Sequence, residues 1–163
     1  MKSKLLELIP SGTCPGIIPY AHKGEWAVHD VLPVFFHRFG AFHLSLATFN
    51  VSEDSLRPIF FMKERGELLS CRFLLDHNVK RHKIDMLFFS SGIADSVRIS
   101  STHMKVLLLE NDKICMSVVG SANMNRNIRH EAGMISTEPD IYNFYKRYYE
   151  DIFQNDSLPF IWD

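Results

Sequence analysis

The sequence has 163 residues, of which 46% are hydrophobic and 23% are charged, and its formal net charge is −1. These values predict one globular domain with a substantial core, and they exclude an intrinsically disordered chain. The small net charge excludes binding to nucleic acid through bulk electrostatics alone, so a nucleic-acid role requires a local basic patch. The longest apolar runs, at 86–89 and 106–109, are far too short to cross a membrane.

The cysteines and the N-terminus bear on the compartment. Cys14, Cys71 and Cys115 are odd in number and show no C-x-x-C spacing, so neither a disulfide framework nor a zinc site is predicted. The first ten residues lack the continuous apolar stretch of a secretory signal. A cytoplasmic location is therefore the default expectation.

Turn-forming residues dominate residues 1–24, which include Pro10, Gly12, Pro15 and Pro19. Glycine and proline at this density favour turns and loops over regular structure. We therefore predict a lead-in segment over the surface at 1–24, followed by a single domain at 25–163.

Helix and strand signals alternate along the first part of that domain. Apolar residues at helical spacing predict a helix over 25–39, and alternating apolar and polar residues predict a strand over 42–51. Ser52 is a good N-cap for a helix over 54–65, which ends at Gly66.

The second part continues the alternation and adds a hairpin. Two apolar runs joined by the polar sequence E-N-D-K predict two antiparallel strands with a tight connection. The elements expected in order are a strand at 71–76, a helical segment at 79–90, a short strand at 97–99, the hairpin of 104–109 and 114–119, a strand at 132–136 and a helix at 139–153. This pattern predicts an α/β fold with a mixed, mostly parallel β-sheet that is flanked by helices on both faces.

The first of two polar clusters is Thr102-His103-Met104-Lys105, at the head of the apolar run 106–109. Residues i and i+2 of a strand point to the same face, so the His103 imidazole and the Lys105 ammonium should lie side by side. This pattern places a nucleophile or proton carrier next to a fixed positive charge.

The second cluster is Gly120-Ser121-Ala122-Asn123, at the end of the partner strand of the hairpin. Ser121 and Asn123 can share a face, and Gly120 permits the close backbone approach that a bound phosphate needs. The hairpin brings both clusters to one end of the sheet. They supply an imidazole that can attack phosphorus and Lys, Ser and Asn donors for the non-bridging oxygens, and such a site needs no metal ion.

A nucleophilic histidine also needs a partner that holds its second ring nitrogen. Glu131, ten residues beyond Ser121 and just before an apolar strand, is the candidate for this role toward His103. A surface ion pair between Glu131 and Arg129 is the alternative.

These residues resemble the signature of the phospholipase D superfamily, which is H-x-K, four residues, D, and then a G-S-x-N block. The chain has H-M-K-V-L-L-L-E at 103–110, G-S-A-N at 120–123 and R-H-E at 129–131. Glu110 stands where the family has aspartate, which keeps the carboxylate, and its expected role is structural. The segment 46–76 also resembles the start of the family's bacterial single-motif nucleases. The resemblance implies a phospholipase D-like fold and a site without a cofactor.

A single H-x-K block is present, and the resemblance therefore implies a homodimer whose two sites meet at the two-fold axis. It implies that His103 of one subunit attacks phosphorus to give a phosphohistidine, while the same residue of the other subunit protonates the leaving oxygen. By the same resemblance Glu131 orients a histidine, either in its own chain or across the interface.

Other polar and aromatic residues allow alternative interpretations. Arg126 and Arg129 are candidates for binding the flanking phosphates of a polymeric substrate, although a solvated loop is equally consistent with them. The basic run at 80–83 is typical of a solvated helix face. The histidines upstream of that run show no metal-binding spacing. The aromatic residues at 142–153 fall on one helix and indicate packing against the sheet or at a dimer interface.

The leading hypothesis is a metal-independent phosphodiesterase that acts on nucleic acid. The chain lacks a basic amphipathic helix that could lie on a membrane, which argues against the alternative of a phospholipid substrate. A second hypothesis is a catalytically silent dimer that uses the same phosphate pocket to bind nucleic acid or a partner protein. The replacement of the family's aspartate by Glu110 favours this hypothesis.

Overall fold

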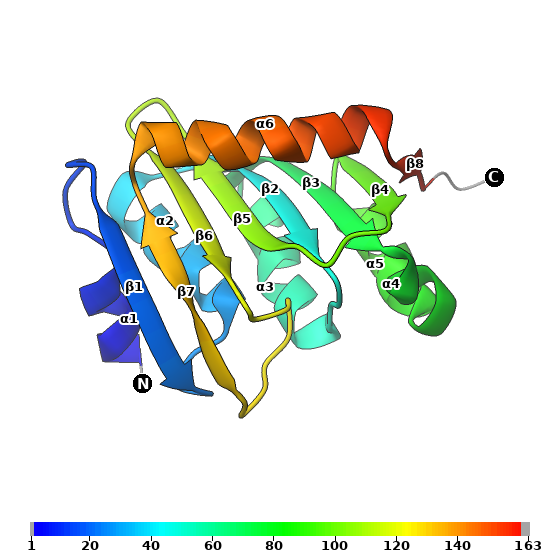
Figure 1. Cartoon of the computed structure of the whole chain (residues 1–163), viewed down its shortest axis with the longest axis horizontal. Coiled ribbons are helices and arrows are strands. Elements are labelled where there is room, and N and C mark those ends of the chain that lie inside the picture. Colours follow the sequence, from blue (N-terminus) through cyan, green and yellow to red (C-terminus); the bar gives the residue numbers. More distant parts are fainter. Residues whose placement is uncertain (1, 161–163) are drawn as a thin grey trace.

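A computed structural model describes residues 2–160 of the chain, in which eight strands form one sheet with helices on both of its faces (Figure 1). The strands lie in the order β1-β7-β6-β5-β2-β3-β4-β8. In chain order they are β1 (Ile17–Lys23), β2 (Phe42–Thr48), β3 (Leu68–Asp76), β4 (Ser96–Ser100), β5 (Lys105–Glu110), β6 (Cys115–Gly120), β7 (His130–Ser136) and β8 (Leu158–Pro159). The predicted α/β sheet with helices on both faces is confirmed.

One long helix, α6 (Pro139–Asn155), crosses one face of the sheet, and the other helices lie on the opposite face (Figure 1). These are α1 (Lys2–Leu8), the 3-10 helix η1 (Val28–Asp30), α2 (Val31–Phe39), α3 (Glu53–Glu64), α4 (His77–His82) and α5 (Ile84–Ile93). Within residues 2–160, every helix is too short or too polar to cross a membrane.

The central strand β5 is buried on both faces, which explains its continuous apolar sequence. Val106 and Leu108 pack with Tyr149 of α6, whereas Leu107 and Leu109 belong to the larger core beneath the helices of the opposite face. A strand covered on both faces has no solvent side to mark with polar residues. The central position of β5 fixes where its polar first residue lies.

The prediction of a mostly parallel sheet is wrong. The pairs β2–β3 and β3–β4 are parallel, whereas β1–β7, β2–β5, β4–β8, β5–β6 and β6–β7 are antiparallel. A parallel pair needs a crossover, which α3 supplies between β2 and β3, and α4 with α5 between β3 and β4. No helix separates β5, β6 and β7, so these strands return antiparallel to one another.

The loop interpretation of the first segment is wrong for residues 17–23. They form β1, which pairs along its full length with β7 at one edge of the sheet. An edge strand tolerates a proline because one side of the strand makes no ladder hydrogen bonds, and Pro19 lies in β1. The density of turn residues therefore concealed a strand.

Two predicted helices have different limits in the structure. Regular helix begins only at Val31 rather than at residue 25, and Pro33 lies in its first turn, where a missing N–H costs little. The helical segment predicted at 79–90 is two helices, α4 and α5, which are separated at Lys83 by a non-helical backbone. The helix α3 begins after Ser52, as predicted, and Gly66 follows it with a φ of 71°.

Candidate active site

Strand direction brings the two predicted polar clusters together. Because β6 is antiparallel to both β5 and β7, the start of β5, the end of β6 and the start of β7 lie at the same end of the sheet. We call this end the site end. Its residues are His103, Lys105, Ser121, Asn123 and Glu131.

His103 and Lys105 lie side by side, as the sequence predicted. The Lys105 Nζ is 3.1 Å from Nδ1 of His103 and also donates a hydrogen bond of 2.7 Å to the His103 backbone carbonyl. The His103 side chain is exposed, and its ring lies 4.9 Å from that of Phe49. Partial burial lowers the pKa of Lys105, although the negative charges of Glu131 and Asp76 oppose this shift.

The backbone around His103 is fixed by Asp76, which sequence analysis did not select. Its carboxylate accepts 2.7 Å and 3.0 Å hydrogen bonds from the backbone N–H groups of Asn78 and Thr102. The Thr102 hydroxyl in turn accepts a 3.2 Å bond from the N–H of Met104. Asp76 therefore ties the start of α4 to the segment that carries His103. A carboxylate at the end of a buried strand was the available signal in the sequence.

Glu131 holds Ser121 in this chain. The Ser121 hydroxyl donates to Oε2 of Glu131 and accepts a 3.1 Å hydrogen bond from the N–H of Ala132. Asn127 donates a 3.2 Å bond to Oε1 of the same carboxylate. The hydrogen bonds of Glu131 thus go to Ser121 and Asn127 rather than to His103, and its orientation of a histidine remains a prediction.

Asn123 is half-buried beyond the end of β6. Its Oδ1 atom is buried, and no donor within residues 2–160 lies within hydrogen-bonding distance of it. A buried polar atom without a partner costs free energy, which functional sites retain more often than structural regions do. The amide of Asn123 is therefore available to a ligand.

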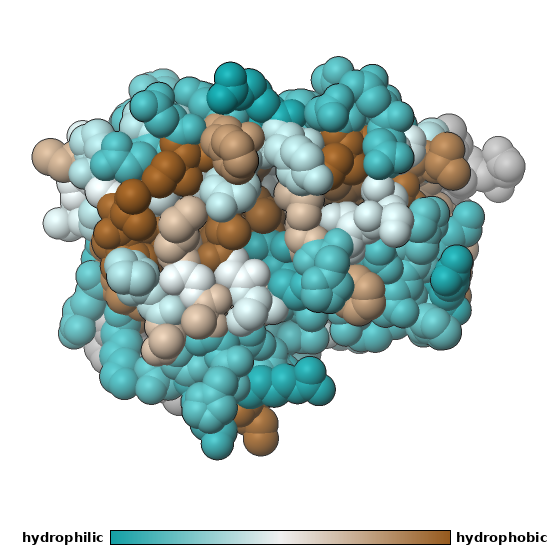
Figure 2. All heavy atoms as spheres, in the orientation of Figure 1, coloured by the Kyte–Doolittle hydropathy of each residue, from teal (hydrophilic) through white to brown (hydrophobic). Residues whose placement is uncertain are grey.

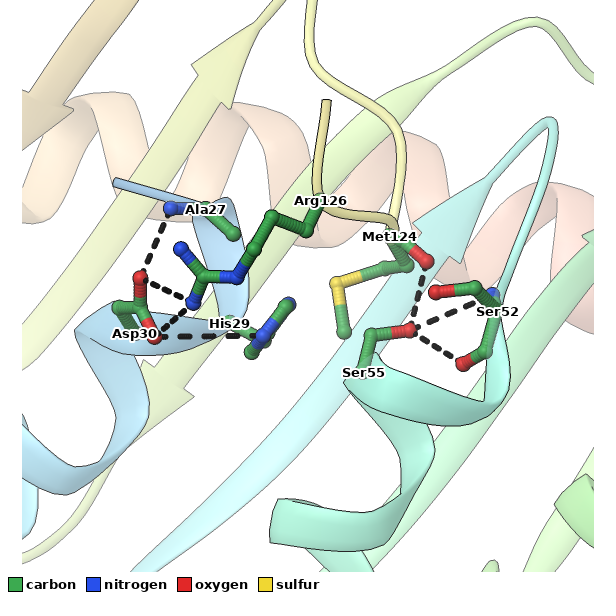
Figure 3. A network of polar contacts seen from close by, with 7 residues as sticks. All are labelled: Ala27, His29, Asp30, Ser52, Ser55, Met124 and Arg126. Atoms are coloured by element: carbon green, nitrogen blue, oxygen red, sulfur yellow. Dashed lines mark hydrogen bonds and ion pairs between the residues drawn. The ribbon is translucent and has the colours of Figure 1, made fainter. Parts of the chain in front are cut away.

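The loop that follows Asn123 is pinned to the neighbouring strand and helix at Met124 (Figure 3). The Met124 N–H donates to the Asn50 carbonyl at 3.1 Å, and its carbonyl accepts bonds of 2.9 Å from the Ser52 N–H and 2.6 Å from the Ser55 hydroxyl. Val51 forms an isolated parallel bridge with Met124. These bonds determine where Ser121 and Asn123 lie.

The same loop carries Arg126, which pairs with Asp30 in η1 (Figure 3). The guanidinium Nη2 lies 3.0 Å from each carboxylate oxygen of Asp30, and Asp30 also accepts a 2.8 Å bond from the Ala27 N–H. The charge of Arg126 is therefore matched within the chain. Arg129 is exposed, and its side chain has no partner within residues 2–160.

Gly120 faces Gly133 across the β6–β7 ladder, and the hydroxyl of Tyr20 fills the space beside both. A Cβ at Gly120 would lie 2.8 Å from the Ala132 carbonyl oxygen, and one at Gly133 would lie 2.6 Å from the Gly120 Cα. Burial, with a contribution from Glu131, raises the pKa of Tyr20 to about 12. In this chain the close approach at Gly120 is to Tyr20 and β7, and its role toward phosphate remains a prediction.

Glu110 lies at the other end of β5 from His103. Its carboxylate forms an ion pair of 2.5 Å with Lys146 of α6. Burial and the nearby Glu110 raise the pKa of Tyr142. This placement is consistent with the predicted structural role of Glu110.

The aromatic residues of α6 divide between the sheet and the surface. Tyr142, Tyr149 and Phe153 are buried, whereas Phe144 and Tyr148 are exposed. Within residues 2–160, no group of three or more His, Cys, Asp or Glu side chains is arranged to hold a metal ion.

No family model and no curated protein matches the chain by sequence. Solved structures do match. Nuc from Salmonella typhimurium, a phospholipase D family member, is 15% identical with a TM-score of 0.65 over 90% of this chain and 99% of its own. NucT from Helicobacter pylori is 13% identical with a TM-score of 0.67, over 89% of this chain and 100% of its own.

The phosphatidylserine synthase of Haemophilus influenzae Rd KW20 is 13% identical with a TM-score of 0.61, over 90% of this chain and 40% of that protein. At such identities the matches establish the arrangement of the elements and not the chemistry. The near-complete coverage of Nuc and NucT shows that the whole architecture is shared. The chain therefore has the Nuc-like fold of the phospholipase D superfamily.

Proposed function

We propose that the protein is a metal-independent phosphodiesterase that acts on nucleic acid. The observation that carries this proposal is the contact between His103 and Lys105, at the same end of the sheet as Ser121 and Asn123. These residues are supplied by a phospholipase D-like fold. An imidazole beside a cation and two polar side chains matches the needs of a phosphodiester whose charge redistributes during attack.

In the proposed reaction a ring nitrogen of His103 forms a bond to phosphorus, and the bond between phosphorus and the leaving oxygen breaks. The leaving oxygen takes a proton from the His103 of a second subunit. Water then attacks the phosphohistidine, and the histidine that gave its proton accepts one from the water. Lys105, Ser121 and Asn123 donate to the non-bridging oxygens, where negative charge accumulates.

The reaction needs two imidazoles, and a homodimer supplies both. An isologous interface at a two-fold axis places the same residue of both chains together. Support comes from Ile128, which lies in the loop between Asn123 and Glu131 and is 82% exposed. A large aliphatic side chain this exposed beside a polar site is suited to burial against a partner subunit.

The decisive experiment measures diester cleavage in EDTA. Substrates are bis-(p-nitrophenyl) phosphate, labelled single- and double-stranded DNA and RNA, and a phosphatidyl lipid. We expect nucleic acid to be cleaved by the wild-type protein and by His37→Ala, an exposed histidine of α2 that serves as the matched control. His103→Ala should lose activity by at least about 10⁴-fold, as removal of a nucleophile does.

The other outcomes identify the alternatives. Turnover of the lipid alone would assign a phospholipid substrate. Binding of oligonucleotide without turnover of any diester would favour the catalytically silent dimer. Activity that persists in His103→Ala would rule out the proposed mechanism.

The dimer has its own test. Light scattering at micromolar concentration should give twice the chain mass of 18.9 kDa. Ile128→Glu should shift the protein toward monomer and lower turnover at low protein concentration. Phe61→Glu, which alters a residue of α3 that is 51% exposed, should change neither. A wild-type protein that is monomeric and active would contradict the composite site.

A further inference from the structure

A pocket of about 460 Å³ opens beside the site end, between the end of β1 and the start of β7. Ser121 and Glu131 line one side of it, and Lys23 and His130 line the other. The pocket is therefore continuous with the candidate active site. It lies where a substrate would extend if its scissile phosphate were bound by Ser121.

Lys23 and His130 are direct partners across the β1–β7 ladder. Both side chains are exposed, and neither has a side-chain partner within residues 2–160. Directly opposed residues on antiparallel strands have Cβ atoms about 5 Å apart, so the ammonium and the imidazole can approach one anion together. Arg126, in contrast, is occupied by Asp30. The unpaired positive charge beside the site end thus comes from β1.

The end of β1 is held in place from two sides. His22 stacks against Trp26 with ring centroids 4.3 Å apart. Gly24 follows β1 with a φ of 66°, and a Cβ there would lie 2.8 Å from the Asn127 carbonyl oxygen and 2.9 Å from the Ile128 Cα. The backbone of this edge is therefore packed against the loop of the active site. A fixed backbone lowers the entropic cost of binding a ligand at Lys23.

We propose that Lys23 and His130 form a subsite for the phosphate adjacent to the scissile one in a polynucleotide. β1 lies two strands from β6, a distance of roughly 10 Å at the usual strand spacing, which an extended lysine side chain shortens. Ala21 and Ala132 form a small apolar surface between the two phosphate positions, where a sugar fits without displacing a charged group. Figure 2 shows hydrophilic surface over this lower end of the sheet, next to the apolar sheet face beside α6.

This subsite rests on the proposed function and narrows its substrate class. A phospholipid with a single phosphodiester has no second phosphate to place there, whereas each internal linkage of a nucleic acid has neighbouring phosphates. Contacts to such phosphates position a polymer without recognising its sequence. Cleavage should therefore become more efficient once a second phosphate is present.

The test compares a dinucleoside monophosphate, which has one diester, with a trinucleotide, which has two. For the wild-type protein we expect a higher kcat/KM on the trinucleotide. In Lys23→Met the ratio of the two kcat/KM values should fall about tenfold, since a hydrogen bond between charged groups is lost. His130→Gln should lower the same ratio by a smaller factor. The control is Lys113→Gln in the β5–β6 turn, at the opposite end of the sheet, which should leave the ratio unchanged.

A second readout separates failure of the subsite from failure of the proposed function. Binding of a short single-stranded oligonucleotide to His103→Ala is measured as a function of salt. Adding Lys23→Met should reduce the slope of log K against log salt by about 0.7, the value for one phosphate contact on a single strand. If both substrates are cleaved and neither the ratio nor the slope changes, the subsite is wrong. If neither is cleaved but the slope changes, the subsite stands and the phosphodiesterase proposal fails.

Discussion

The two ends of the β5–β6 hairpin carry similar polar residues in different states. At the turn end, Glu110 is paired with Lys146 at 2.5 Å, and Asn111 donates bonds of 3.0 Å and 3.2 Å to the carbonyls of Phe39 and Ala41. At the site end, Lys105 contacts His103 rather than a carboxylate. Polar groups are therefore paired within the fold at one end and remain available at the other.

This difference shows that position in the hairpin, rather than residue type, separates structural from functional side chains. Both ends of these strands are fixed by the same buried core, including Leu107 and Leu109. The core lets the site end keep groups whose hydrogen-bonding capacity is not fully used, such as the Oδ1 of Asn123. Changes at the two ends should accordingly affect different measurements.

The largest expected effect comes from comparing the two lysines. Lys105→Met should lower kcat on nucleic acid by about 10² to 10³-fold, the usual cost of losing one donor to transition-state charge. Lys146→Met should leave kcat unchanged and alter only stability, because its partner is Glu110 at the turn end. Steady-state kinetics of both variants test this, and equal losses in kcat would abolish the distinction between the ends.

Gly120 tests how tightly the site end is packed. Gly120→Ala should lower the free energy of unfolding by about 2 kcal/mol, since the new methyl group meets the Ala132 carbonyl and the Tyr20 hydroxyl. Gly12→Ala is the control, because a Cβ there meets nothing within 4 Å. Urea unfolding measures both variants. A Gly120→Ala protein as stable as the wild type would show that this contact is not close.

The pH dependence of catalysis follows from the lowered pKa of Lys105. A lysine with a lowered pKa loses its proton, and with it the charge needed by the transition state, at a lower pH than an ordinary lysine. The activity should therefore fall on the alkaline side at a pH below the usual lysine range. Lys105→Arg keeps its charge at high pH, so any activity it retains should not show this fall. Rate profiles of the two proteins decide the matter.

The smallest expected effect is at the turn end. Glu110→Gln removes a partly exposed ion pair with Lys146 and should cost about 0.5 kcal/mol of unfolding free energy, reduced further by added salt. The kcat should be unchanged. A large loss of activity with normal stability would instead connect Glu110 to the chemistry and would revive the question raised by its replacement of aspartate.

The local features of the site were predictable from the sequence because they depend on short-range spacing. The two-residue separation of His103 and Lys105 places them side by side on any extended segment, and the structure confirms their contact. The hairpin was also visible in its apolar runs and polar turn, so the approach of Ser121 to the same end followed. These inferences require no knowledge of the rest of the fold.

Partners that come from distant segments were not predictable. The pairing of Arg126 with Asp30 joins residues 96 positions apart, and the contact of Tyr20 with Gly120 joins β1 to β6. Asp76 reaches Thr102 across 26 positions. No local pattern encodes such contacts, because they exist only after the sheet has assembled.

The sequence by itself determined the alternation of helices and strands, the apolar core strands and the chemistry of the H-x-K and G-S-A-N clusters. Only the tertiary structure decided that residues 17–23 form an edge strand, that most strand pairs are antiparallel, and that Glu131 holds Ser121. The physical reason is that periodicity reports which face of an element is buried, whereas strand order and hydrogen-bond partners depend on the arrangement of the whole sheet.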